Sequence, residues 1–222
     1  MDAGASLGLH RNKTPRVGAL IDVNRRGCVF ILLSFVLMSA VHAAARGPAA
    51  AFSLRGHVHA IDDGDTLELD TADGRIRVRL SDFDAPEVAH ARNPYPDGAA
   101  GRRRCPDAPQ RAPGQPGGMA ARRALTELAP PGTEVQARCY EYDRYGRAVC
   151  HLYRGEQNIN RALILAGHGW LAPKARWIRD AESRAALAQA KRARRGVWRQ
   201  SNPIEPARWR QHCWCEGQCA RS

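Results

Sequence analysis

The sequence has very little lysine, no internal repeat and no long apolar segment. Lysine occurs only at Lys13, Lys174 and Lys191 among 222 residues, so the net charge of +12 comes almost entirely from arginine. The missing repeat leaves no basis for a tandem-repeat architecture. The longest apolar run, Cys28–Ala40, is shorter than the roughly 20 residues with which a helix crosses a bilayer comfortably.

The arginine content points to a polyanionic partner. The planar guanidinium group can bind a phosphate through two parallel hydrogen bonds. Residues 1–45 carry five Lys/Arg and two Asp/Glu, so the remaining chain keeps a net charge of +9. A GC-rich coding sequence would also favour arginine over lysine, but it would not account for the size of the net charge. We therefore expect a nucleic acid or a similar polyanion as the partner.

Residues 1–45 are typical of a secretory signal. Arg25 and Arg26 precede the apolar run, and residues 41–43 follow it as Val-His-Ala, a small-x-small cleavage pattern. Because about two dozen residues come before this arginine pair, either translation starts further downstream or the pair serves a twin-arginine route. We expect a periplasmic or secreted protein. The alternative is that residues 28–45 remain as an uncleaved membrane anchor.

Cysteine usage agrees with export. One of the seven cysteines lies in the signal segment, which leaves an even number: Cys105, Cys139, Cys150, Cys213, Cys215 and Cys219. An even count in an exported chain favours disulfides. Cys139 and Cys150 are symmetric about Arg144 and Tyr145, so they would face each other if a hairpin turn is centred there. We predict a Cys139–Cys150 disulfide.

The three cysteines near the C-terminus allow two interpretations. Cys213, Cys215 and Cys219 could form a zinc site with His212, but their spacing is poor for a structural zinc site. Disulfides are favoured, with Cys105 bonded to one of the three and the other two paired together. The sequence does not fix which pairs form.

Alternation of apolar and polar residues predicts five strands and three helices. The strands are expected at Gly56–Ile61, Thr66–Leu69, Arg75–Leu80, Glu134–Cys139 and Ala148–Tyr153. The helices are expected at Met119–Leu128, Ile159–Ala166 and Arg179–Arg194. Short strands with helices inserted late favour an α+β fold, a five-stranded OB-type β-barrel with three helices. The expected organisation is a signal or anchor at 1–45, a linker at 46–54, the barrel domain at 55–200 and a cysteine-containing tail at 201–222.

Two acidic motifs lie at strand ends. The first, residues 63–66 (Asp-Gly-Asp-Thr), contains Asp65 at a turn and on its own is best interpreted as a solvated turn. In the second, Pro86 biases Ala85 toward an extended conformation, which would fix the directions of the Ala85 carbonyl and the Asp84 and Glu87 carboxylates. Hard oxygen ligands of this kind suit calcium or magnesium. A plain acidic strand end is the alternative for this motif.

A third motif lies at the tip of the last predicted hairpin and reads Asp143-Arg144-Tyr145-Gly146-Arg147. Arg147 could reach a phosphate from there or remain a solvated loop charge. Together with Arg79 on the third strand, the three motifs in this order resemble the staphylococcal nuclease (thermonuclease) family. The resemblance covers Leu54–Trp198, and it extends to the segments at 160–163 and 196–198.

The resemblance implies a calcium site. Asp65 and Asp84 would bind Ca²⁺ through their carboxylates, and Ala85 through its backbone carbonyl, with water as most of the remaining ligands. The family usually has threonine at the position of Ala85. A carbonyl ligand survives that change, whereas any hydroxyl contribution is lost.

The resemblance also implies catalytic and substrate-binding residues. Glu87 would activate or orient the attacking water, and Arg79 and Arg147 would hold the phosphate and offset the charge of the transition state. Arg144 and Tyr145 match positions that contact the nucleotide. These assignments describe hydrolysis of a phosphodiester.

The chain departs from the family in its nucleotide pocket. The family prototype has two tyrosines after its second helix that pack against the bound nucleotide, and the corresponding stretch, Ala172–Ala175, has none. Trp170 or Trp177 could take their place by stacking.

These observations predict an exported, Ca²⁺-dependent, sugar-non-specific endonuclease. Its substrates would be DNA and RNA, the resemblance implies 3′-phosphate products, and the protein is expected to be a monomer with no stable protein partner. Contact with a membrane is expected only if the N-terminal segment is uncleaved. One alternative is a catalytically weak or inactive nucleic-acid-binding module on the same barrel. Another is a surface-anchored interaction protein whose cysteine tail meets a partner, so that residues 199–222 would be needed for function.

Overall fold

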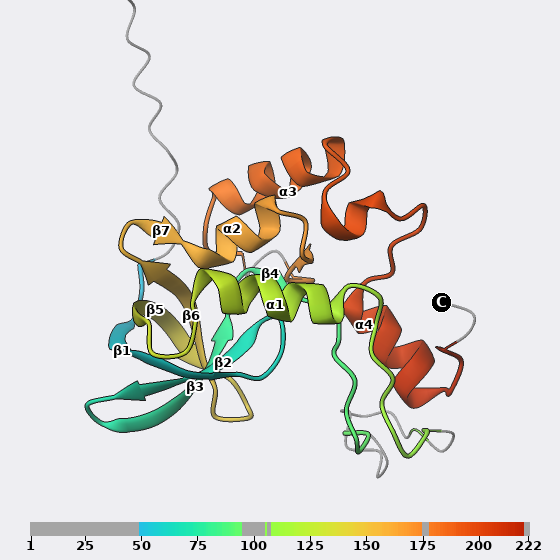
Figure 1. Ribbon diagram of the computed structural model, residues 1–222, viewed down its shortest axis with the longest axis horizontal. Helices are drawn as coiled ribbons and strands as arrows, with labels where there is room; N and C mark the ends of the chain where they lie inside the picture. Colours follow the sequence, from blue (N-terminus) through green and yellow to red (C-terminus); the bar gives the residue numbers. More distant parts are fainter. Residues whose placement is uncertain (1–48, 95–104, 106–107, 175–177, 220–222) are drawn as a thin grey trace, which may run out of the picture. The chain divides into compact units, whose positions relative to one another are not determined.

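A computed structural model describes residues 49–94, 105, 108–174 and 178–219 of the chain (Figure 1). The predicted signal or anchor segment at 1–45 lies outside these residues, as does Trp177. Within the described ranges, no helix is both long and apolar enough to span a membrane.

Five strands close into a barrel, as predicted. They are β1 (Phe52–Ile61), β2 (Thr66–Thr71), β3 (Gly74–Leu80), β5 (Glu134–Tyr142) and β6 (Ala148–Arg154). Neighbours in the order β3-β2-β1-β5-β6 pair antiparallel, and a parallel pairing of β3 with β6 closes the sheet. The fold is therefore a mixed, five-stranded OB-like barrel of the α+β class.

Alternation within each strand separates the barrel interior from its surface. Val78 and Leu80 of β3 are buried, whereas Arg75 and Arg77 are exposed on the opposite face. Arg79 shares the face of these arginines but is only partly exposed. The two-residue period of a strand thus places Leu80 in the core and its neighbour Arg79 at the edge of a pocket.

The three predicted helices are present and lie on one side of the barrel (Figure 1). They are α1 (Gly118–Leu128), α2 (Ile159–Leu165) and α3 (Glu182–Arg192). In Figure 1, α1 crosses the barrel, while α2 and α3 pack beside each other beyond it. Two short strand pairs complete this region: β7 (Gln157–Asn158) extends the sheet next to β6, and β4 (Phe83–Asp84) pairs with β8 (Trp170–Leu171).

Helix α3 begins three residues after the predicted start. The backbone N–H groups of Arg179 and Asp180 donate to the carboxylate of Asp82, at 2.8 and 2.7 Å. Asp82 is buried and holds a left-handed backbone conformation, with φ of 64°. The helix therefore starts only after these two hydrogen bonds to the turn that follows β3. The periodicity of the sequence alone does not reveal them.

The barrel also begins earlier than expected. Phe52 pairs with Cys139 of β5 and stacks on Tyr142, with ring centroids 5.1 Å apart. The last three residues of the expected 46–54 linker therefore belong to β1. At the other end, the expected tail contains α4 (Pro206–Trp209) and the short π-helical turn η3 (Arg210–Cys215), which follow the 3₁₀ turn η2 (Gly196–Arg199).

Asn160 joins the helical layer to the closure of the barrel. Its fully buried side chain accepts from the Leu152 N–H at 2.9 Å and donates to the carbonyls of Ser81 and Cys150, at 2.8 and 3.0 Å. These three backbone groups lie where β3 meets β6. A buried amide that satisfies them fixes the end of β3, from which the next acidic motif departs.

All six cysteines of the described chain are in disulfides: Cys139–Cys150, Cys105–Cys215 and Cys213–Cys219. The first pair faces across β5 and β6 in register, as the hairpin symmetry predicted. The other two pairs follow the disulfide interpretation rather than the zinc alternative. One of them joins the long loop before α1 to the tail.

We expect the double variant Cys139→Ala/Cys150→Ala to lower the free energy of unfolding by about 2–3 kcal/mol, because the cross-link restricts the unfolded chain. Urea unfolding followed by fluorescence measures this difference. The variant Cys213→Ala/Cys219→Ala is the control, since it loses a disulfide within the tail and leaves the barrel cross-link intact. Equal unfolding midpoints for wild type and the barrel variant would contradict the expectation.

Candidate active site

One cavity of about 810 Å³ collects the predicted site residues from three separate motifs. Its wall contains Arg79, Asp84, Glu87, Arg144, Tyr145 and Arg147. Asp65 and Ala85 lie behind this wall and are only 3% and 4% exposed. The barrel therefore brings the end of β3, the following acidic segment and the β5–β6 hairpin to one place.

Asp65, Arg79 and Asp84 form a buried ion-pair cluster. The guanidinium of Arg79 donates to Asp65 Oδ1 at 2.6 Å and to Asp84 Oδ1 at 2.8 Å. The pairing of Thr66 with Arg79 across β2 and β3 sets this proximity. The Ala85 N–H donates to Asp65 Oδ2 at 2.9 Å, so both acidic motifs converge on the same carboxylate.

Burial dominates the electrostatics of this cluster. It raises the pKa of the Asp65 carboxyl to about 7, although the charge of Arg79 acts in the opposite direction. Burial would also lower the pKa of Arg79, but Asp65 and Asp84 outweigh it, so that pKa lies above its usual value. The solvated-turn interpretation thus does not describe Asp65, whose carboxylate is enclosed and paired.

The acidic cluster suits a hard cation. Asp65 and Asp84 offer buried carboxylate oxygens. Burial makes ionisation of Asp65 unfavourable, and a nearby cation would offset this cost by stabilising the charged carboxylate. The described residues contain no cluster of three or more His, Cys, Asp or Glu arranged to hold a metal. The carboxylates of Asp65 and Asp84, the backbone carbonyl of Ala85 and water would together be a chemically appropriate ligand set for calcium.

The backbone of Glu87 is fixed by the segment that leads into α1. The Gln115 N–H donates to the Glu87 carbonyl at 2.8 Å, and the Glu87 N–H donates to Gln115 Oε1 at 3.2 Å. A Cβ atom at Gly118 would lie 2.2 Å from the Glu87 carbonyl oxygen. Glycine is therefore required at the first residue of α1 for this approach.

The side chain of Glu87 pairs with an arginine from the tail. Arg210 contacts Glu87 Oε1 and lies 3.8 Å from Asp84 Oδ2. Burial raises the pKa of Glu87 to about 7, against the lowering effect of Arg210. The Glu87 carboxylate, which is expected to activate or orient the attacking water, is thus enclosed, and the Glu87 side chain is 14% exposed.

Arg147 is held at the tip of the β5–β6 hairpin by its own loop. Asp143 accepts from Arg147 Nε at 2.8 Å and from the Arg147 N–H at 3.0 Å. A second guanidinium nitrogen lies 3.4 Å from the hydroxyl of Thr66. Gly146 has a φ of 76°, which allows the tight turn between these residues. The guanidinium is therefore oriented toward the cavity before any substrate binds.

This turn should respond to acid. Burial would raise the pKa of Asp143, but hydrogen bonds from the side chain and backbone of Arg147 and from the Tyr145 N–H lower it below its usual 3.8. A carboxyl whose folded pKa is lowered stabilises the fold above its unfolded pKa, and this contribution disappears as pH falls through the folded pKa.

We therefore expect Asp143→Asn to lower the free energy of unfolding by about 1 kcal/mol at pH 7, because a charged acceptor is lost. The difference from wild type should shrink as pH falls below 3.8. Urea unfolding at pH 7 and at pH 3 tests both statements. Asp73→Asn, at the exposed tip of the β2–β3 hairpin, is the control. A difference that stays constant with pH would refute the expectation.

The residues expected to contact the nucleotide differ in exposure. Tyr145 is 63% exposed at the edge of the cavity, and the Arg144 guanidinium lies 4.9 Å from its ring centre. Trp170, considered as a replacement for the missing tyrosines, is only 7% exposed and packs edge-to-face on Trp198 at 5.2 Å. Trp170 is therefore part of the interior, and among the described residues of the cavity wall Tyr145 is the exposed aromatic ring that can stack on a base.

The closed OB-like barrel, with acidic residues and arginines around one cavity, has the fold and the site chemistry of a phosphodiester-hydrolysing nuclease. Residues 77–200 match the family model described as staphylococcal nuclease homologue. The chain belongs to the staphylococcal nuclease family.

Individual proteins that are similar to this chain are also named as nucleases or endonucleases. The chain is 32% identical over 165 residues to a micrococcal nuclease of Shigella flexneri, which covers 70% of this chain and 80% of the relative. It is 29% identical over 151 residues to an uncharacterized endonuclease of Haemophilus influenzae, covering 68% and 69%. It is 33% identical over 143 residues to a probable staphylococcal-like nuclease of Oryza sativa subsp. japonica, covering 61% and 29%.

Sequence reasoning did not identify two residues of this site. The sequence indicates only that Asp143 belongs to a hairpin tip, yet in the fold its carboxylate orients Arg147. Arg210 lies beyond the span that matches the family, in the segment that the sequence identifies only as a cysteine-containing tail. The cysteines within and just after its helical segment, Cys213, Cys215 and Cys219, are the one sequence signal that this part of the chain is anchored to the domain.

Proposed function

We propose that the protein is an exported, Ca²⁺-dependent endonuclease that cleaves DNA and RNA without sugar specificity and leaves 3′-phosphate ends. The observation that supports this most strongly is the convergence of Arg79, Asp84, Glu87 and Arg147 on one cavity. An inactive binding module would have no need for an enclosed acid beside preoriented arginines.

Different side chains of the cavity act on the attacking water and on the phosphate during hydrolysis. Glu87 orients or deprotonates the attacking water, for which its enclosed carboxylate faces the cavity. Arg147 and the N–H groups of Arg79 not engaged by carboxylates bind the phosphate oxygens. Both guanidinium groups are held by other residues in advance, so they stabilise developing negative charge without reorganisation.

Calcium would be held by the carboxylates of Asp65 and Asp84 and by the backbone carbonyl of Ala85. When bound, it supplies positive charge for a non-bridging phosphate oxygen and lowers the pKa of nearby water. The enclosed oxygens of the two aspartates support this choice of a hard cation.

The surface around the cavity supports a single-stranded or locally opened nucleic acid as substrate. Arg144 and Lys174 add cations to the cavity wall, and the exposed ring of Tyr145 can stack on a base. The net charge of +9 that the chain keeps beyond residue 45 favours association with any phosphate backbone. Stacking and backbone contacts do not distinguish ribose from deoxyribose, which is consistent with action on both polymers.

Export is proposed from two observations. The N-terminal segment has the sequence pattern of a secretory signal, and the described domain carries three disulfides. Disulfides of this number are typical of oxidising compartments. We propose a periplasmic or secreted monomer, with membrane anchoring through residues 28–45 as the outcome if the segment is not cleaved.

Digestion of plasmid DNA and of a defined RNA, with Ca²⁺ or with EDTA, tests the proposal. Activity with Ca²⁺ on both substrates, 3′-phosphate ends and loss in EDTA are expected, together with weaker binding as salt rises. Full activity in EDTA would exclude the calcium requirement. Inactivity with every divalent cation would instead favour the binding module.

A further inference from the structure

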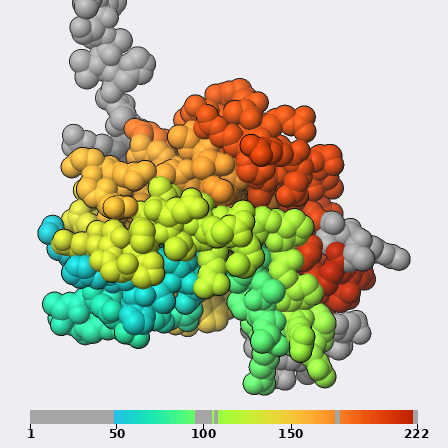
Figure 2. Space-filling model, in the orientation of Figure 1, coloured from blue at the N-terminus to red at the C-terminus, as the bar shows by residue number. Residues whose placement is uncertain are grey.

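The tail, defined here as residues 201–219, is anchored to the loop that precedes α1. The indole N–H groups of Trp209 and Trp214 both donate to the Pro113 carbonyl, at 3.3 and 2.8 Å. The Cys105–Cys215 disulfide joins the same two segments covalently. Figure 2 shows the tail packed beside this loop.

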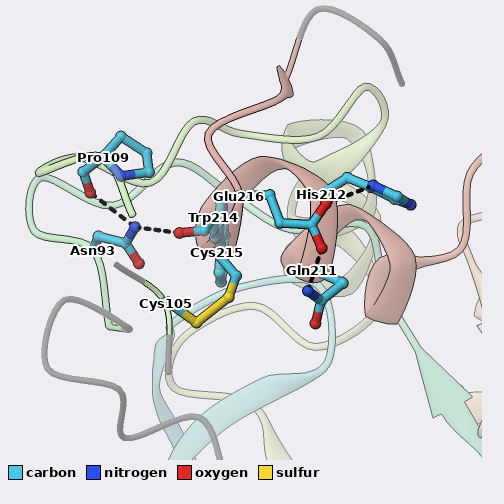
Figure 3. The surroundings of a disulfide bond; sticks show 8 residues. All are labelled: Asn93, Cys105, Pro109, Gln211, His212, Trp214, Cys215 and Glu216. Carbon is cyan, nitrogen blue, oxygen red and sulfur yellow. Dashed lines mark hydrogen bonds and ion pairs between the residues drawn. A yellow bond between two sulfur atoms is a disulfide. The ribbon is translucent and has the colours of Figure 1, made fainter. Parts of the chain in front are cut away.

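Further hydrogen bonds fix the position of the tail. The buried amide of Asn93 donates to the carbonyls of Pro109 and Trp214, at 2.8 Å each (Figure 3). Gln115 donates to the Ile204 carbonyl at 2.6 Å while its Oε1 accepts from the Glu87 N–H. One buried side chain, Gln115, therefore holds both the tail and the backbone of Glu87.

The anchored tail places Arg210 in the wall of the active-site cavity. Its guanidinium contacts Glu87 Oε1 and lies within ion-pair distance of Asp84 Oδ2. The Arg210 side chain is 26% exposed, so this contact is partly shielded from water. Ion pairs in such surroundings restrict side-chain orientation more than fully solvated pairs do.

We propose that Arg210 is a positioning residue that holds the Glu87 carboxylate in the orientation needed for attack on the phosphodiester, and that the disulfide-anchored tail is therefore part of the active site. The inference rests on the proposed nuclease function. Arg210 itself touches neither water nor phosphate in this role and acts through Glu87.

The geometry favours positioning over occlusion. With Arg210 in its wall, the cavity still measures about 810 Å³ and still reaches Arg79 and Arg147. The covalent link through Cys215 and the hydrogen bonds of Asn93 and Gln115 also make the tail a fixed element rather than a displaceable lid. A general base fixed in this way loses less entropy on reaching its reactive geometry.

The test compares the full-length variants Arg210→Ala, Arg210→Lys and Arg208→Ala in Ca²⁺-supported digestion of a short oligonucleotide. Arg208 is the matched control, because it is an exposed arginine of the same tail. We expect Arg210→Ala to lower kcat by about 10- to 100-fold with little change in KM, the size of loss caused by a misplaced catalytic group. Arg210→Lys should recover part of the loss, and Arg208→Ala should behave like wild type.

A double-mutant cycle separates positioning from a general structural effect. In a Glu87→Gln background, Arg210→Ala should cause little further loss, because its effect passes through the Glu87 carboxylate. Disulfide mapping and the Tm of each variant check that the Cys105–Cys215 link and the fold are intact. The double variant Cys105→Ala/Cys215→Ala should lower kcat in the same direction as Arg210→Ala.

The results are distinguishable. An active wild type with Arg210→Ala equally active would overturn this inference and leave the nuclease function in place. A rise in activity would overturn it in favour of an inhibitory tail, and a full additional loss in the Glu87→Gln background would show that Arg210 acts independently of Glu87. An inactive wild type would remove the proposed function and this inference with it.

Discussion

Replacing Arg147 with alanine should lower kcat/KM on DNA and RNA by about 10²–10³, the loss typical for one preorganised donor to a developing negative charge. The side chain is held by Asp143 and Thr66 at the edge of the cavity, so its N–H groups need no rearrangement to meet a phosphate. Alanine removes this charge and leaves the barrel core untouched. Initial rates at low substrate concentration measure the effect.

The control for that experiment is Arg75→Ala. Arg75 is an exposed arginine of β3 that pairs with Asp70 on the barrel surface, so this variant has the same change in net charge. Circular dichroism and Tm establish that both variants are folded. If Arg147→Ala and Arg75→Ala differ by less than a few fold in rate, Arg147 has no part in transition-state stabilisation.

Replacing Glu87 with glutamine should lower kcat by about 10²–10⁴, the contribution typical of general acid–base catalysis. Glutamine keeps the shape of the side chain and one acceptor for Arg210, but it cannot accept a proton from water. The loss should appear in single-turnover rates with bound substrate, because the substitution alters the chemical step.

Glu134→Gln serves as the comparison for Glu87→Gln. Glu134 lies at the exposed start of β5, where it pairs with Arg55. Substrate binding measured by fluorescence anisotropy should change little in either variant. If Glu87→Gln turns over substrate as fast as wild type, another group activates or orients the attacking water.

The barrel followed from local patterns, whereas the roles of the site residues came from the resemblance to the nuclease family. Alternation identified the strands, and an antiparallel β2–β3 pair necessarily brings the residues after the first turn close to the end of β3. That register explains why Asp65 and Arg79 are in contact. The cysteine symmetry about the hairpin likewise fixed how β5 and β6 align.

Other features depend on contacts between segments that are distant in the chain. Arg210 reaches Glu87 across a sequence separation of 123 residues, and no periodicity in the tail indicates that approach. The late start of α3 depends on Asp82, in the turn between β3 and β4. Trp170 could not be assigned to the interior without its partner Trp198. Such pairings are decided by tertiary packing rather than by local propensity.

The Cys105–Cys215 bond closes a ring that contains two of the five barrel strands, the helices α1 to α3 and the hairpin bearing Arg147. A protease that cuts once anywhere inside this ring yields two pieces that remain joined through sulfur. For a cut in the β5–β6 hairpin, the Cys139–Cys150 bond also joins the two cut ends. In the extracellular or periplasmic setting proposed for this protein, a single nick would therefore not release a fragment from the folded domain.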